Sequence, residues 1–255
     1  MPRKASIVAI LALALLVVGG GGAYAFEIHG ADFIFSVGGG ITPSALPRRA
    51  YAPIQFQGTV DIAPKSQGGV PPALERAVFE FDREGRLGTR GLPTCTVSAV
   101  AEATPQEART ACGGAIVGTG KLAATIALPG RAPVSATSAL TLFNGVPEGG
   151  NPTVILHARL TAPVTQTFAV VVPIERLHGS YSYRATIDVP PIAGGHGALT
   201  RIEAKVGRRY RAGGRQLSYI SARCFRGIFE ARGTFTASDG SRLTIPFFKP
   251  CRVRG

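Results

Sequence analysis

The sequence predicts an all-β protein, either an antiparallel β-sandwich or a strongly curved sheet, with one short helix and two disulfides. Apolar and polar residues alternate with a period of two over many short segments, and turn dipeptides separate these segments. Hydrophobic residues make up 45% of the 255 residues, which is enough to build a core and excludes disorder of the whole chain. Charged residues make up only 17%, which excludes a coiled coil.

Residues 1–25 have the layout of a secretory signal peptide, with a short positive start, the apolar run 5–18 and small residues before Ala25. We expect cleavage after Ala25, which leaves a secreted protein or an extracytoplasmic protein of the cell surface. An uncleaved membrane anchor is the alternative, but the run is shorter than the roughly 20 residues of a spanning helix. No later stretch approaches that length, so no transmembrane span is expected after cleavage.

The remainder of the chain is expected to form one folded unit. Residues 38–67 are rich in Pro, Gly and Ala, so we expect a flexible lead-in over residues 26–53. No repeat of fixed period and no sharp linker follows. The sequence therefore predicts a single antiparallel β domain over residues 54–255.

Strands are clearest where the alternation is strict, as in residues 181–189 and 199–206. In residues 227–237, Phe229 and Phe235 face one way while Glu230 and Arg232 face the other. The pair Asp239-Gly240 that follows is a hairpin signal. Further strands are expected at residues 54–62, 77–81, 120–128, 135–143, 153–160, 167–174, 217–222 and 243–248.

One helix is expected directly after Thr104. The sequence Thr104-Pro105-Gln106-Glu107 is a capping box with proline at the first helical position, and Gly113 ends the helix about two turns later. A helix this short is not stable alone and needs to be held by the rest of the fold.

The chain has four cysteines, and in an exported protein an even number indicates disulfides. Four cysteines allow three pairings; proximity in the sequence favours Cys95 with Cys112 and Cys224 with Cys251. A zinc site is the alternative, but none of the cysteines has the clustered C-x₂₋₄-C spacing that zinc sites use. We therefore expect no metal.

No motif in the sequence indicates a catalytic centre or a cofactor, and no catalytic residue is assigned. His157 shares a strand face with Arg159, so we expect it to face solvent, and His196 lies in a glycine-rich loop. A hydrolase built around either histidine would need an Asp or Ser within hydrogen-bond reach. The sequence Asp82-Arg83-Glu84-Gly85 lacks the ligand pattern of a calcium loop and is expected to form a turn.

The net charge of +13 is unevenly distributed. Residues 199–255 contain 13 of the 28 basic residues but only 3 of the 15 acidic ones. This excess of positive charge can mark a binding surface, or it can reflect only the amino-acid composition of a GC-rich genome, which favours arginine. The densest part reads as a loop between two strands and is the candidate anion-binding site, formed by Arg208, Arg209, Tyr210, Arg211 and Arg215.

Several stretches resemble uncharacterised exported proteins of high-GC actinobacteria. The likeness covers most of residues 70–252 and implies a disulfide-bearing β-protein outside the cytoplasmic membrane, with no activity to transfer. The stretches that carry it are Gly91-Leu92-Pro93-Thr94-Cys95, Cys112-Gly113-Gly114-Ala115-Ile116-Val117-Gly118, Val189-Pro190-Pro191-Ile192-Ala193-Gly194-Gly195, residues 233–240 and Phe248-Lys249-Pro250-Cys251.

These observations favour a non-enzymatic protein that associates with the cell envelope through its basic C-terminal region. The expected partner is an anionic envelope polymer or lipid, because export makes nucleic acid an improbable one. Two other functions are weighed: a carrier that holds an apolar ligand such as a lipid in a curved-sheet cavity, and, with less support, a hydrolase.

Overall fold

The structure is a computed structural model that describes residues 24–29, 33–66 and 68–254. Most of the expected signal peptide lies outside these residues. Its expected cleavage bond, after Ala25, falls within the first described strand, β1 (Tyr24–His29).

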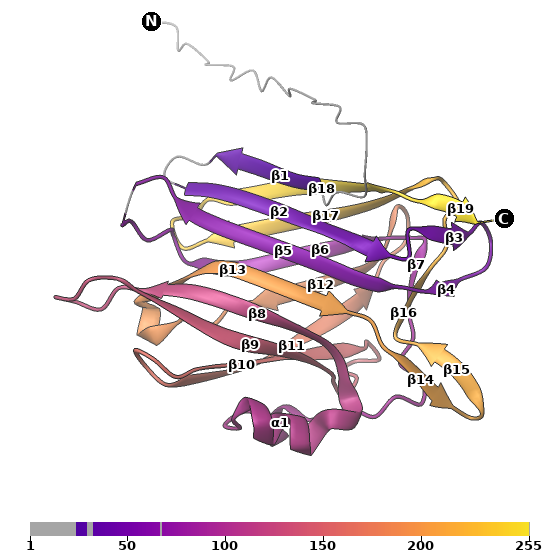
Figure 1. Ribbon diagram of the computed structural model, residues 1–255, viewed down its shortest axis with the longest axis horizontal. Helices are drawn as coiled ribbons and strands as arrows, with labels where there is room; N and C mark the ends of the chain where they lie inside the picture. Colours follow the sequence, from indigo (N-terminus) through magenta and orange to yellow (C-terminus); the bar gives the residue numbers. More distant parts are fainter. Residues whose placement is uncertain (1–23, 30–32, 67, 255) are drawn as a thin grey trace, which may run out of the picture.

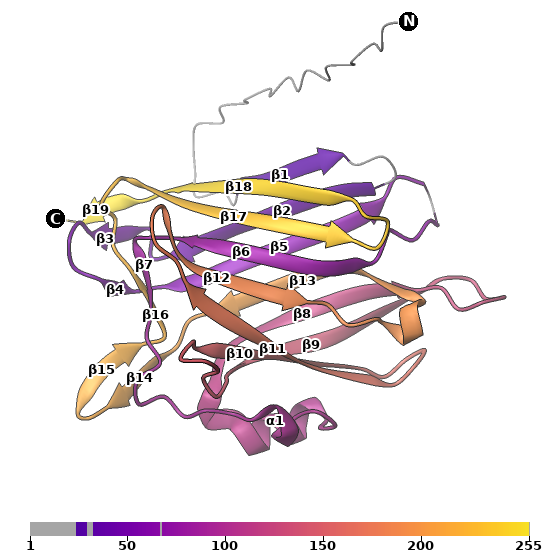
Figure 2. The same ribbon diagram turned by 180° about the vertical axis from the view of Figure 1, so that it is seen from behind.

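Within the described residues, twelve strands form one antiparallel sheet that curls into a half-barrel, which confirms the predicted fold class (Figures 1 and 2). Strands that follow one another along the chain are often neighbours, as the short turns require. The spatial order is β1, β2 (Phe33–Thr42), β5 (Gln55–Pro64), β13 (Gly197–Val206), β8 (Ile116–Ile126), β9 (Val134–Asn144), β10 (Thr153–Leu160), β11 (Gln166–Arg176), β12 (Tyr181–Asp188), β6 (Leu74–Asp82), β17 (Ile228–Ala237) and β18 (Arg242–Pro250).

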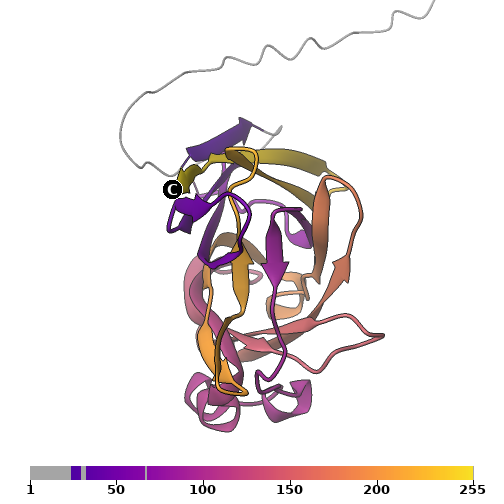
Figure 3. The same ribbon diagram turned by 90° about the vertical axis from the view of Figure 1, so that its right-hand side faces the viewer.

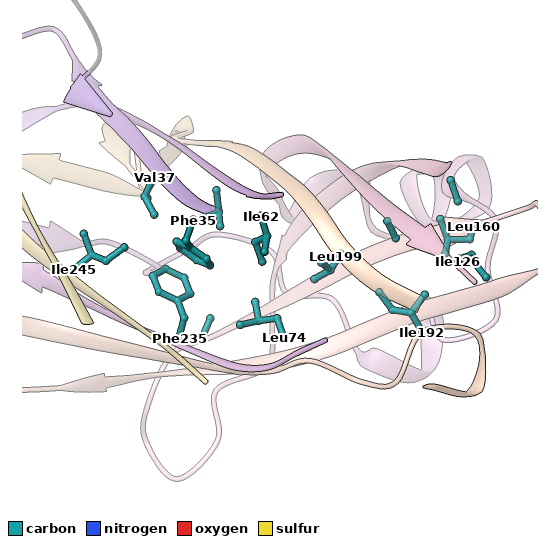
Figure 4. Close-up of a cluster of buried hydrophobic side chains, with 14 residues drawn as sticks. Phe35, Val37, Ile62, Leu74, Ile126, Leu160, Ile192, Leu199, Phe235 and Ile245 are labelled. Atoms are coloured by element: carbon teal, nitrogen blue, oxygen red, sulfur yellow. The ribbon is translucent and has the colours of Figure 1, made fainter. Parts of the chain in front are cut away.

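The curl brings the two ends of the sheet face to face. The rings of Phe35 of β2 and Phe235 of β17 pack against each other at a tilt of 50°, with centroids 4.5 Å apart, although about 200 residues separate them along the chain. Phe35, Leu74 and Phe235 converge in the interior, where they join apolar side chains from most of the other strands (Figure 4). The apolar face of each alternating strand lines this core, and the polar face lies outside.

The segment expected to be a flexible lead-in is part of the sheet. β2 pairs with β5 over ten residues, and its Phe35 and Val37 are buried in the core. The glycines of Gly38-Gly39-Gly40 suggested flexibility, but at Gly39 a β-carbon would lie 2.9 Å from the carbonyl oxygen of Gln57, so close backbone approach favours glycine there. The β domain therefore begins well before residue 54.

The outer face of the sheet is covered at β9 and β10 by the helical segment. The helix α1 (Pro105–Cys112) starts at Thr104 with the predicted capping box, and the short 3₁₀ turns η1 (Val97–Ala99) and η2 (Gly113–Ala115) flank it. Both predicted disulfides are present, Cys95–Cys112 and Cys224–Cys251. The first of them closes the helical segment onto the sheet, where Ala108 and Cys112 pack with Phe143 and Ile155.

Three small sheets lie at one end of the half-barrel, which faces the viewer in Figure 3. Two of them join segments that are far apart in the sequence, and the third replaces the loop expected at residues 208–215 with a β-hairpin. They are β4 (Ala52–Pro53) with β16 (Ile220–Ala222) and β7 (Gly85–Leu87), the parallel pair β3 (Ala45–Pro47) with β19 (Arg252–Arg254), and the hairpin β14 (Arg209–Ala212) with β15 (Arg215–Ser218).

Candidate functional site

The small sheets at this end of the half-barrel (Figures 1 and 3), and the segments next to them in the chain, carry exposed arginines. They come from four separate parts of the chain. Only the arginines of the hairpin and of the C-terminus belong to the basic region, residues 199–255, that the sequence indicated. We call this surface the basic end and define it by Arg48, Arg49, Arg86, Arg90, Arg209, Arg211, Arg215, Arg252 and Arg254.

The hairpin β14–β15 presents part of the predicted anion-binding set. Its two-residue turn, Gly213-Gly214, has φ of 56° and 72°, which only glycine adopts readily. Arg209 and Arg211 share one exposed face of β14, and Arg215 begins β15 at the tip. Among the described residues, none of these three arginines forms an ion pair with a carboxylate.

The side chains of Arg208 and Tyr210, the other two predicted site residues, hydrogen-bond backbone carbonyls of other segments and so anchor the hairpin. The guanidinium of Arg208 donates to the carbonyl oxygens of Gly114 in η2 at 2.7 Å and of Ile116 at the start of β8 at 2.8 Å. The hydroxyl of Tyr210 lies 3.0 Å from the carbonyl oxygen of Arg90 and donates to it. The predicted set therefore divides into two anchoring residues and three exposed arginines.

Acidic residues near the basic end are buried and already paired. Glu84 is 2% exposed and accepts from Arg223. Asp82 is 6% exposed, and its Oδ2 accepts from Arg226 at 2.8 Å and from the backbone N–H of Glu230 at 2.7 Å. These carboxylates are therefore not available to neutralise the exposed arginines.

The expected turn after Asp82 is also present, since its Oδ1 accepts from the N–H of Glu84 at 2.8 Å. Within the described ranges, no group of acidic, histidine or cysteine side chains could hold a metal ion.

Aromatic rings lie among the arginines. The guanidinium of Arg86 stands 3.8 Å from the ring centroid of Tyr51, and that of Arg223 lies 5.0 Å from the same centroid. Phe225 is 45% exposed, with Arg48 and Arg223 both within 6 Å of its ring centroid. The surface thus offers planar cations and an exposed ring side by side.

A second charged cluster lies on the outer face of β6, β12 and β17. Glu80 is 5% exposed and sits directly between Arg184 and Arg232 of the two neighbouring strands, accepting hydrogen bonds from both. Burial raises the pKa of Glu80, but the hydrogen bonds from the two guanidinium groups outweigh it and lower the pKa overall. This carboxylate is ionised and structural.

Among the described residues, neither His157 nor His196 has an Asp or Ser side chain within hydrogen-bond reach. His157 was expected to face solvent, but it is fully buried because the helical segment covers the outer face of β10. Its Nε2 lies 3.0 Å from the carbonyl oxygen of Ala103, and its Nδ1 has no hydrogen-bond partner among the described residues. His196 follows η3 (Ala193–Gly195), and the only hydrogen bonds found for it within the described chain are made by its backbone.

Buried apolar side chains from β2, β5, β6, β8, β13, β17 and β18 pack together in the interior of the curled sheet (Figure 4). A pocket of about 20 Å³ remains between Phe33, Leu74 and Leu243 at the mouth of the core, which is room for about one water molecule and not for an acyl chain. A larger open cleft of about 390 Å³ lies between β11 and β12.

No family model, curated protein or solved structure matches the chain. In the part of the chain that the structure describes, no helix has both the length and the apolar character needed to span a bilayer.

Proposed function

We propose that this chain is an exported protein that associates with an anionic surface of the cell envelope, a polymer or a lipid headgroup layer, through the basic end. The observation that carries the proposal is the set of exposed arginines that form no ion pair with a carboxylate of the described residues, beside carboxylates that are buried and paired. The role is one of binding, and no catalytic step is assigned.

Guanidinium groups suit this role because they stay charged and bind phosphate or carboxylate oxygens through two parallel hydrogen bonds. Arg209 and Arg211 project from the same face of a paired hairpin, so both guanidinium groups can reach one anionic surface. The exposed ring of Phe225 adds an apolar contact of the kind that inserts between lipid headgroups.

Export is the second part of the proposal. The two disulfides are consistent with an extracytoplasmic protein. The signal peptide with cleavage after Ala25 and the resemblance to exported actinobacterial proteins both support secretion, which favours envelope polymers and lipids over nucleic acid as partners.

Sedimentation with vesicles and with purified anionic cell wall tests the proposal. The triple variant Arg209→Gln, Arg211→Gln and Arg215→Gln is compared with the parent chain on phosphatidylglycerol vesicles, on phosphatidylcholine vesicles and on cell wall. Each arginine near an anionic surface contributes about 1 kcal/mol, so the triple variant should bind about 100-fold more weakly at low salt. Binding of the parent should also weaken as sodium chloride rises.

The matched control removes the same charge from the opposite end of the half-barrel (Figure 1). The exposed residues Lys65 directly after β5, Arg131 between β8 and β9, and Arg242 at the start of β18 lie on that side, and the triple variant Lys65→Gln, Arg131→Gln and Arg242→Gln should bind nearly as the parent does. Equal losses in the two triple variants would show that net charge alone drives binding, and unchanged binding in the hairpin variant would contradict the proposal.

A further inference from the structure

The large sheet has an internal gap, because β11 and β12 pair over only part of their length. The ladder between them comprises three residue pairs, from Ile174 opposite Ala185 to Arg176 opposite Tyr183. Figure 2 shows the two strands meeting near the turn that joins them and separating away from it. Continuing the register would place Pro173 opposite Thr186, and proline has no N–H to donate there, so the ladder ends at that point.

The edge that β11 turns toward this gap has unused backbone hydrogen-bonding groups. The N–H of Ile174 donates to the carbonyl of Pro152 on the β10 side. Successive residues of an antiparallel strand alternate sides, so the even-numbered residues of β11 bond the β10 side from Gln166 to Ile174. Thr167, Ala169 and Val171 consequently direct both N–H and C=O into the gap, where the described chain provides no backbone partner.

The opposite wall repeats this arrangement. The N–H of Val189 donates to the backbone carbonyl of Glu75 on the β6 side. Because successive residues alternate sides, Thr186 and Asp188 of β12 turn their backbone N–H and C=O groups toward the gap. Unpaired strand edges of this kind bind other extended chains unless something covers them.

The gap coincides with the open cleft of about 390 Å³. Its walls are mainly apolar, with Phe168 and Val170 on one side and Val189 and Pro190 on the other. One end is closed by Gln166, whose side chain donates to the carbonyl of Pro191 and accepts from the N–H of Ala193. The cleft is therefore closed at one end by a hydrogen-bonded side chain, has apolar walls, and exposes the backbone N–H and C=O groups of β11 along one edge.

We propose that this cleft binds an extended polypeptide segment of a partner protein, which adds as an antiparallel strand to the free edge of β11. Only a peptide backbone offers alternating N–H and C=O groups at the repeat of Thr167, Ala169 and Val171. An acyl chain would fill the apolar walls but leave these groups without partners, at a cost comparable to lost hydrogen bonds. β12 runs antiparallel to β11, so a strand bound antiparallel to β11 lies parallel to β12.

The geometry also sets the character of the segment. The free edge spans five residues, about 16 Å of extended chain. Side chains of an added strand alternate between the two faces, so every second residue points toward Phe168 and Val170 and should be apolar. The residues between them face outward and are free to be polar.

The deciding variant is Ala169→Pro. It removes an N–H that points into the gap and places a proline ring on the edge, while every bond from β11 to β10 is kept. β11 already contains one proline, Pro173, at an odd-numbered position whose backbone nitrogen also points away from β10, as that of residue 169 does. Ala169→Ser is the matched control, because it changes the same side chain and keeps the N–H. Circular dichroism and thermal midpoints establish that both variants fold.

A phage-displayed library of random dodecapeptides is selected on the immobilised full chain, and the enriched peptides are then synthesised for fluorescence polarisation. We expect alternating apolar residues in the enriched peptides, and at least about a tenfold loss of affinity in Ala169→Pro but not in Ala169→Ser. No enriched peptide, equal affinity for both variants, or a labelled fatty acid whose binding displaces the peptides and survives Ala169→Pro would each overturn the proposal.

Amide hydrogen exchange gives a readout that does not depend on any variant. In the free chain, the N–H groups of Thr167, Ala169 and Val171 should exchange rapidly while those of Phe168 and Val170 are protected by β10. Bound peptide should slow the first three. Slowing confined to the basic end would place the peptide elsewhere and contradict the proposed site.

Discussion

The imidazole of His157 is 3.0 Å, through Nε2, from the carbonyl oxygen of Ala103, and this contact joins β10 to the segment that enters α1. The ring is fully buried, and the buried Nδ1 has no partner among the described residues. Burial lowers the pKa of His157, and the nearby guanidinium of Arg159 acts in the same direction. The fold therefore accepts the neutral ring, with the proton on Nε2 donated to Ala103.

This relationship predicts a dependence of stability on pH. The pKa of His157 is lower in the folded chain than the value of about 6.5 in the unfolded chain, so the unfolded chain binds the proton first as the pH falls. The free energy of unfolding should fall below about pH 6.5, by at most about 1.4 kcal/mol per pH unit from this group, and level off below the folded pKa. Urea unfolding of the parent and of His157→Gln measures the difference, and identical pH profiles would refute the assignment.

The Cys95–Cys112 disulfide should control the burial of His157. Replacing both cysteines with alanine removes a cross-link that stabilises by about 3 kcal/mol and frees the segment that covers β10. We expect a lower thermal midpoint and a pKa of His157 that moves back up toward its ordinary value, measured by NMR titration. The matched variant, Cys224→Ala with Cys251→Ala, should lower the midpoint and leave that pKa unchanged.

Glu80 should be a structural carboxylate. Glu80→Gln removes the negative charge that Arg184 and Arg232 share, and the loss of these charge-assisted hydrogen bonds should cost about 1–2 kcal/mol of unfolding free energy. Both arginines are partly exposed, which keeps the effect moderate. Glu75→Gln, an exposed position on the same strand, should change stability little; urea unfolding at pH 7 compares the two.

Substitutions of the adjacent residues Arg208 and Arg209 should affect different properties, the first the stability of the chain and the second its binding to anionic vesicles. Arg208→Gln replaces the guanidinium that donates to the carbonyls of Gly114 and Ile116 with a shorter, neutral amide, and should destabilise the chain by about 1–3 kcal/mol. Arg209→Gln should leave stability unchanged and weaken binding to anionic vesicles. Thermal unfolding and vesicle sedimentation on both variants check this, and a stable Arg208→Gln variant would contradict the anchoring role.

Much of the fold followed from local patterns. Alternation located the strands, as in β10, where the expected and observed bounds agree, because a half-buried strand needs one apolar face. The capping box located α1, and sequence proximity paired the cysteines correctly. The extent of β2 was missed because its glycines read as flexible, whereas the neighbouring strand, and not the local sequence, supplies its partners.

The sequence by itself located most of the long strands and the helix, paired the cysteines and showed where the positive charge is concentrated, because each depends on neighbours within a few tens of residues. The tertiary structure decided which faces are covered and which charges are paired. His157 is buried because a distant segment packs over its strand, and Arg208 is anchored because η2 presents carbonyls to it. The basic end arises from contacts between segments far apart in the sequence, and the cleft arises where β11 and β12 separate beyond Pro173; the alternation of apolar and polar residues shows neither.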